Sequence, residues 1–134
     1  MSDQTVDDLV SAARAAMPNA YAPYSRFSVG AAVLAGGRVF VGVNVENASY
    51  PQGVCAERAA VAAAVAAGQR SIDAVAVVSS APGDAVTPPC GGCRQVLNEF
   101  GPDMLVISEA ADGTRRRWRL SELLPDAFGP HDLA

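Results

Sequence analysis

The chain has 134 residues, of which 50% are apolar, with a formal net charge of −4 and a mean hydropathy of +0.17. This length fits one ordinary domain, and no apolar run reaches the roughly 18 residues that a membrane span needs. The acidic N-terminus lacks a signal-peptide pattern, and the pI near 4.8 disfavours nucleic acid as a partner. We therefore expect a single cytoplasmic domain over residues 1–134 that binds neither a membrane nor nucleic acid.

Helices and strands are predicted to alternate along the chain. A pattern resembling a helix-capping box begins at Thr5, and apolar residues follow at helical spacing until Pro18. Gly36 and Gly37 separate two apolar runs and predict a β-hairpin. The predicted elements in chain order are a helix over 5–17, strands over 29–34 and 39–45, a helix over 55–67, a strand over 74–78, a helix over 90–100, strands over 104–107 and 115–120, and a short helix at 121–124. This order indicates an α/β fold with a mixed sheet covered on both faces.

The three cysteines are the most informative residues. Cys55 opens one predicted helix, and Cys90 and Cys93 open the next, where the helix N-terminus favours thiolate over thiol. An odd number of cysteines cannot be fully paired, which suits a reducing compartment. A structural zinc site uses four ligands, whereas three protein ligands leave one position open for chemistry. We therefore predict a catalytic Zn²⁺ site, with one ion per subunit, held by these three thiolates.

Two charged residues follow the first cysteine. Glu57 is predicted to be the catalytic acid and base, which carries protons between a water at the zinc and the substrate. Arg58 is predicted to donate to the thiolates from outside the ligand set and to offset their negative charge. The alternative for Arg58 is that it points to solvent.

Other functions remain open at this point. The pair Cys90 and Cys93 alone is also typical of a thiol redox protein, although the third cysteine with Glu57 argues against it. A structural zinc module lacks a fourth ligand, because the only histidine, His131, lies in the C-terminal tail and is predicted to be a surface residue. The arginine run over 115–117 is interpreted as a solvated strand face. A zinc count together with an assay for ammonia separates an enzyme from these alternatives.

Further sequence blocks extend the pattern over nearly the whole chain, and together they resemble the cytidine deaminase family, in its small homotetrameric zinc-dependent type. The blocks that carry the resemblance are residues 24–32, 42–48, 55–58, 89–95 and 123–128. Zinc-dependent deaminases use a cysteine or histidine set with a glutamate that is not a ligand. Branches that act on nucleotides or on tRNA usually have histidine where Cys55 stands, so the resemblance favours a free nucleoside.

The resemblance implies a three-layer α/β/α fold around a mixed five-stranded sheet and assigns further substrate-binding residues. Asn44 and Glu46 match the pair that hydrogen-bonds the ribose 3′-hydroxyl, although they could instead organise the loop. Phe27 matches the aromatic residue on the pyrimidine ring, unless it is an ordinary core residue, and the Ala56 N–H matches a group that reads the base edge. Two further matches, Tyr50 in an inter-subunit loop and Phe128 at a neighbouring subunit's site, imply a homotetramer with shared sites.

The implied reaction is hydrolytic deamination of cytidine and 2′-deoxycytidine in pyrimidine salvage. Glu57 would protonate N3 of cytosine, water activated by zinc would attack C4, and ammonia would leave to give uridine or 2′-deoxyuridine. An alternative with the same fold is a deaminase of a related aminated nucleoside, such as a nucleoside antibiotic.

Overall fold

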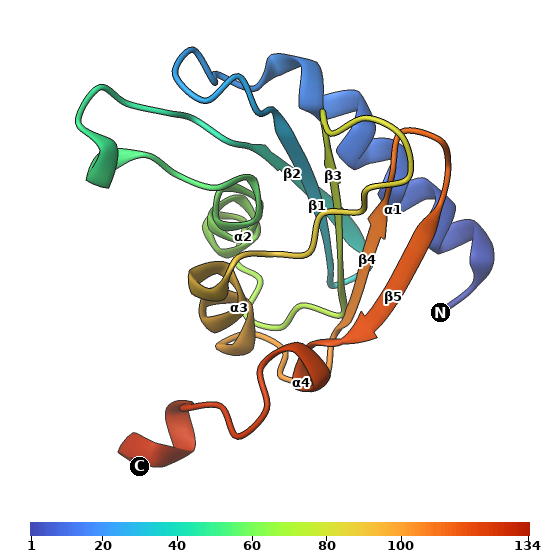
Figure 1. Ribbon diagram of the computed structural model, residues 1–134. Coiled ribbons are helices and arrows are strands. Elements are labelled where there is room, and N and C mark those ends of the chain that lie inside the picture. The colour runs from blue at the N-terminus through green and yellow to red at the C-terminus, as the bar shows by residue number, and fades with distance from the viewer.

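A five-stranded mixed sheet with strand order β2-β1-β3-β4-β5 forms the middle layer of the structure, a computed structural model that describes residues 1–134 (Figure 1). Only the central pair β3–β4 is parallel, and the other neighbours are antiparallel. The strands are β1 (Val29–Ala35), β2 (Arg38–Val43), β3 (Ala74–Ser79), β4 (Leu105–Glu109) and β5 (Arg115–Arg119). The predicted fold class and all five predicted strands are confirmed.

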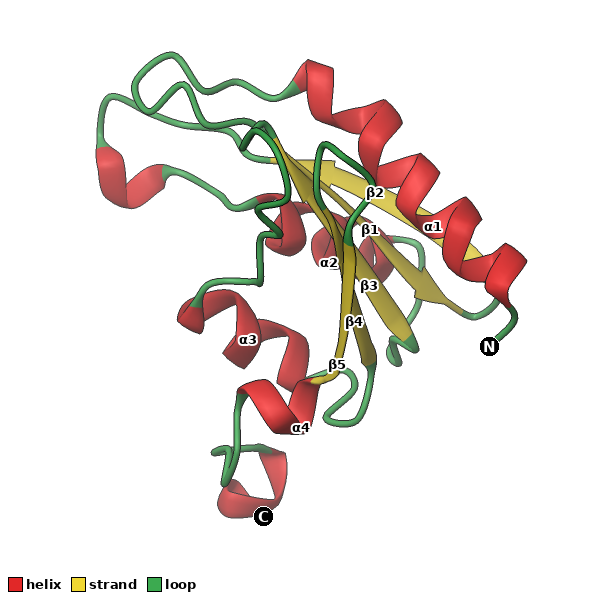
Figure 2. Ribbon diagram, turned by 45° about the vertical axis from the view of Figure 1, so that its right-hand side comes forward, coloured by secondary structure: helices red, strands yellow, loops and turns green.

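Helices cover both faces of this sheet (Figure 2). One helix, α1 (Asp3–Ala16), lies alone on one face, and α2 (Ala56–Ala66), α3 (Gly91–Asn98) and α4 (Leu120–Leu123) lie on the other. Three short 3₁₀ helices lie outside these elements, at Met17–Asn19, Tyr50–Gln52 and Pro130–Leu133. No helix combines the length and the apolar character that crossing a membrane would require.

Alternate residues of β3 supply two separate hydrophobic cores, because successive side chains of a strand point to opposite faces. Val75 and Val77 pack with α2 and α3, whereas Ala76 and Val78 pack against α1. All six residues of β3 are buried, as predicted for this strand. A central strand that is apolar on both faces therefore fixes the three layers and the position of the helices.

Some predicted boundaries differ from the structure. The capping box at Thr5 is wrong, because Ser2 is the N-cap residue and its hydroxyl accepts a hydrogen bond from the Thr5 N–H at 3.1 Å. The last short helix begins at Leu120, one residue before the predicted start. The predicted hairpin turn is confirmed, with Gly36 and Gly37 at φ values of +58° and +74° that favour glycine.

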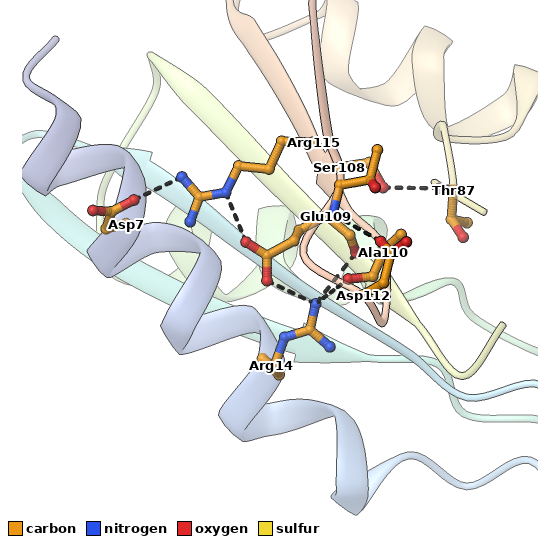
Figure 3. Close-up of polar contacts among 9 residues, drawn as sticks. Asp7, Arg14, Thr87, Ser108, Glu109, Ala110, Asp112 and Arg115 are labelled. Carbon is orange, nitrogen blue, oxygen red and sulfur yellow. Dashed lines mark hydrogen bonds and ion pairs between the residues drawn. The ribbon is translucent and has the colours of Figure 1, made fainter. Parts of the chain in front are cut away.

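Ion pairs attach α1 to the far edge of the sheet (Figure 3). Glu109 at the end of β4 accepts from Arg14 at 3.0 Å and from Arg115 at 2.7 Å, and Arg115 also reaches Asp7 at 2.6 Å. The arginine run is thus an exposed strand, as predicted, but Arg115 is held between two carboxylates. This network joins α1 to β4 and β5 away from the cysteines.

Candidate active site

The first cysteine lies where the loop after β2 enters α2. Cys55 is the N-cap residue of α2, and its side chain makes no capping hydrogen bond, so its sulfur remains available as a ligand. Five of the first six residues of α2 are alanine, arginine or glutamate, which are strong helix formers. The helix therefore starts firmly at Ala56, and Glu57 lies in its first turn.

The other two cysteines lie at the start of α3. Cys90 is the N-cap residue, and its sulfur accepts a hydrogen bond from the Cys93 N–H at 3.5 Å. The segment before Cys90 is anchored by Thr87, whose N–H donates to the Ser108 hydroxyl at 2.8 Å and whose own hydroxyl lies 2.7 Å from that of Ser79. These anchors at the ends of β3 and β4 bring the α3 N-terminus beside that of α2.

The three sulfur atoms lie within 4.8 Å of one another, and all three cysteines are free thiols. Sulfurs that share one tetrahedral zinc at about 2.3 Å stand roughly 3.8 Å apart, so a small contraction would let them hold the ion. His131 lies in the exposed tail, so this set offers only three protein ligands. The residues present therefore fit a zinc site with an open position.

The expectation that both helix starts favour thiolate holds for only one cysteine. Burial raises the pKa of Cys55 and of Cys93, and the crowding of other negative groups, Glu57 and the neighbouring thiols, adds to it. At Cys90 burial also acts upward, but hydrogen bonds from Cys93 leave its pKa below the ordinary value. Since burial favours the thiol form of the two less exposed cysteines, a bound cation would shift all three toward thiolate.

Arg58 lies against the α3 N-terminus rather than pointing to solvent. A side-chain hydrogen bond with Cys93 is the largest cause of the raised pKa of Arg58, and the charges of all three cysteines contribute. A Cβ at Gly92 would stand 2.2 Å from Nη2 of Arg58, so the guanidinium lies directly on this glycine. Arg58 thus supplies positive charge beside the sulfurs while Nε remains buried without a partner.

Glu57 is almost fully buried, with an exposed fraction of 5%. Burial raises the pKa of its carboxyl group, against smaller opposing effects of hydrogen bonds and of Arg58. The carboxyl group lines a cavity of about 440 Å³ together with Cys55, Ala56 and Cys90. A carboxyl group whose protonated form is favoured, beside three sulfurs in a cavity, is suited to proton transfer.

Part of the wall of this cavity comes from the loops that follow α1 and β2. Asn44 accepts from the Val29 N–H and donates to the Phe27 carbonyl, both at 2.8 Å. Glu46 accepts from the Tyr24 and Ser25 N–H groups at 2.9 and 3.1 Å. Both side chains organise the loop, as the alternative interpretation held, and both also line the cavity.

Of the remaining predicted substrate-binding residues, three line the same cavity and one does not. Phe27 is exposed and lines the cavity, so it is not an ordinary core residue. Ala56 and Tyr50 also line it, and Tyr50 is 75% exposed. Phe128 is absent from the lining and lies exposed in the tail beyond α4. Within one chain, the structure thus brings all predicted site residues except Phe128 together at the cavity or at the sulfurs.

Two polar residues that line the cavity, Ser25 and Thr87, were not singled out from the sequence. Ser25 lines both this cavity and an adjoining one of about 360 Å³, and Thr87 lines the first. Ser25 lies in a sequence block that carried the resemblance, which is the one signal that pointed to it. Thr87 has no such signal, because its partners Ser79 and Ser108 are distant in sequence.

Comparisons with known proteins agree with this geometry. Residues 3–109 match the family described as "Cytidine and deoxycytidylate deaminase zinc-binding region". The cytidine deaminase of Sporosarcina psychrophila is 42% identical over 131 residues, which cover 96% of this chain and 95% of the relative. The Mycobacterium tuberculosis cytidine deaminase is 50% identical over 119 residues, covering 88% of this chain and 85% of that one.

Solved structures give the same answer for the fold and the family. The crystal structure of cytidine deaminase from Burkholderia pseudomallei superposes with a TM-score of 0.85 at 46% identity, and the match covers 96% of this chain and all of that one. Zinc is therefore the cofactor, because the matched region is a zinc-binding region and contains the three clustered cysteines. The chain belongs to the cytidine and deoxycytidylate deaminase family.

Proposed function

We propose that this chain is a zinc-dependent hydrolase that converts free cytidine and 2′-deoxycytidine to uridine and 2′-deoxyuridine with release of ammonia. The observation that carries the proposal is the buried Glu57 carboxyl group beside three clustered sulfurs at one cavity. The two relatives described above are named cytidine deaminases, and the matches cover 95% and 85% of their lengths. The net reaction exchanges the C4 amino group of cytosine for oxygen and consumes one water.

The chemistry divides between the metal and the chain. Zinc held by Cys55, Cys90 and Cys93 would act as a Lewis acid that makes a water acidic enough to attack at neutral pH. Glu57 is proposed to carry one proton of that water to N3 of the ring, and then to carry the second proton, from the hydroxyl added at C4, to the departing amine as the C4–N bond breaks and the C4 carbonyl forms. Burial of Glu57 supports this role, because it raises the pKa of the carboxyl group toward the range in which it can both accept and donate.

The polar groups of the cavity favour a nucleoside over a nucleotide. The lining contains two carboxylates, Glu46 and Glu57, and no arginine, lysine or histidine. A phosphate would therefore meet negative charge without a cation to pair with. Although the family description includes deoxycytidylate, these residues support an uncharged sugar as the substrate.

Asn44 and Glu46 are suited to hold a sugar hydroxyl. After its two bonds to the loop, the Asn44 amide retains one N–H and one lone pair. The Glu46 carboxylate, which accepts three hydrogen bonds from the loop, retains about one of its four acceptor positions. A hydroxyl can accept from the amide and donate to the carboxylate, so we propose that this pair binds the 3′-hydroxyl.

The base is proposed to pack on Phe27 and to meet the Ala56 N–H at its edge. Exposed Tyr50 and Phe128 support a homotetramer in which chains share their sites, since Phe128 does not line the cavity of its own chain. We further propose that residues 1–134 act as one deaminase domain in the cytoplasm, in pyrimidine salvage.

The direct test is the loss of ultraviolet absorbance when the protein is mixed with cytidine, with ammonia and zinc measured on the same sample. We expect conversion to uridine, about one zinc per chain and slower conversion of cytidine 5′-monophosphate. Faster turnover of the monophosphate would overturn the choice of a free nucleoside. A folded, zinc-loaded protein that leaves cytidine and 2′-deoxycytidine unchanged would overturn the proposed reaction.

A further inference from the structure

The Ser25 hydroxyl connects the two loops that form the sugar side of the cavity. Its Oγ donates to Oε2 of Glu46 and accepts a hydrogen bond from the Phe27 N–H at 3.0 Å. The Ser25 N–H also donates to Oε1 of the same carboxylate at 3.1 Å. One residue therefore holds both oxygens of Glu46, and Ser25 and Glu46 line both adjoining cavities.

The direction of the Ser25 hydroxyl hydrogen follows from these contacts. Because the Phe27 N–H occupies an acceptor position of Oγ, and because a carboxylate can only accept, the hydroxyl hydrogen points to Glu46. Hydrogen bonds from Ser25 are also the main reason why the pKa of Glu46 lies below its ordinary value. Glu46 is thereby kept as a fixed, ionised acceptor.

The surrounding loop supports this arrangement at some conformational cost. Arg26, between Ser25 and Phe27, has a φ of +59°, a region that residues other than glycine seldom occupy. The Arg26 N–H donates to the Ala22 carbonyl at 3.0 Å, and the Asn44 amide holds the Phe27 carbonyl. An unusual backbone held from several sides indicates a loop built to place its side chains rather than a free surface turn.

We propose that Ser25 is a positioning residue that aims the remaining acceptor position of Glu46 at the sugar 3′-hydroxyl of the substrate. This inference rests on the proposed deamination of a nucleoside at this cavity. Ser25 acts through Glu46, so its effect on the substrate depends on the one hydroxyl that Glu46 contacts.

The test compares cytidine with 3′-deoxycytidine, which differs only at that hydroxyl. Ser25→Ala should lower kcat/KM for cytidine about tenfold, the order expected for a hydrogen bond to a charged group. The loss should appear chiefly as a higher KM, since Glu46 contacts the 3′-hydroxyl both in the bound substrate and during the reaction. The same change should alter kcat/KM for 3′-deoxycytidine less than about twofold. If 3′-deoxycytidine reacts too slowly, competitive inhibition by uridine and 3′-deoxyuridine provides the same comparison. Ser25→Thr, which keeps a hydroxyl, should restore most of the activity on cytidine.

Ser28→Ala is the matched control, because it removes a hydroxyl from the same loop that makes no hydrogen bond within the chain, and it should leave both substrates unaffected. Adding Ser25→Ala to a Glu46→Gln variant should cause little further loss. Zinc content and melting temperature should match those of the parent protein throughout.

Equal losses on both nucleosides, or full additivity with Glu46→Gln, would overturn the positioning role and leave Ser25 with a part only in folding the loop. An unchanged Ser25→Ala variant would overturn it as well. Failure of the proposed function is distinguishable from these outcomes, because in that case the unaltered protein itself would not convert cytidine.

Discussion

The variant Gly42→Ala is expected to separate the two helix starts that carry the cysteines. Gly42 lies on β2 directly under the first turns of α2, and a Cβ there would stand 2.4 Å from both the Ala56 carbonyl oxygen and the Ala60 amide nitrogen. Real Cβ atoms essentially never approach within 3.0 Å of such atoms. Since both atoms belong to the helix backbone, relief requires α2 as a whole to move, together with Cys55 at its N-cap.

The magnitude follows from this overlap. Overpacking a well-packed site typically costs about 1–3 kcal/mol, and backbone rather than side-chain atoms block the new methyl group, so we expect the upper end of that range. For a domain of this size, each kcal/mol lowers the melting temperature by roughly 4 °C, which predicts a loss of about 8–12 °C. A displaced Cys55 should also weaken zinc binding, because the three sulfurs no longer meet at one point.

Thermal melts of the zinc-loaded protein and competition with a chelator measure both effects. Gly91→Ala is the matched control, because a Cβ at that position meets nothing within 4 Å although it adjoins Cys90. It should leave the melting temperature and the zinc content near those of the parent. A Gly42→Ala protein with unchanged melting temperature and zinc affinity would refute the claim that close approach of α2 to β2 sets the site.

The remaining predictions concern the site and the ion pairs. Glu57→Gln should keep zinc and lose about 10²–10⁴ in rate, as measured by initial rates beside a zinc count, and near-normal turnover would contradict its role. Cys93→Ala should lose zinc and melt at a lower temperature, because metal binding is coupled to folding; full metallation of the purified variant would argue against the ligand set. Arg58→Ala should release zinc to a chelator about 10–100-fold more readily, and unchanged release would place its charge outside the site's influence. Glu109→Gln should lower the free energy of unfolding in urea by about 1 kcal/mol, less so in high salt, whereas Asp3→Asn, at a 3.9 Å pair with a 97% exposed carboxylate, should have almost no effect.

Local sequence signals predicted the elements on which the cysteines lie. Cys55 and Cys90 stand at the predicted helix starts, because alanine-rich sequence follows the first and a proline precedes the second. The apolar run over residues 74–78 likewise indicated a buried strand, which the structure confirms as β3. Helix N-caps were less certain: Ser2 and Thr5 are both good caps, and the helix gains another turn by starting at the earlier one.

Properties that depend on tertiary burial could not be read from the sequence. A cysteine at a helix N-terminus carries a local preference for thiolate, but the layers that close over Cys93 raise its pKa instead. The contacts of Asn44 with residues 27 and 29 depend likewise on the loop conformation at Arg26. Short-range patterns thus predict which residues meet at the site, whereas the direction of each side chain follows from packing between distant segments.

The polar groups of the interior show how the fold maintains this site. The buried polar or charged residues are Glu57, Ser79, Asn98 and Ser108. Ser79 and Ser108 hold Thr87 in the segment that leads to Cys90, and the Asn98 amide lies 3.4 Å from the carbonyl oxygen of Phe128. Burying a polar group is unfavourable unless it is hydrogen-bonded. Here Ser79 and Ser108 bond to the segment that leads to Cys90, and Asn98 bonds to Phe128, which is proposed to reach a neighbouring subunit's cavity. Glu57 remains buried beside the sulfurs, where the same desolvation raises the pKa of its carboxyl group, so the polar residues of this core are explained by the site more readily than by the stability of the sheet.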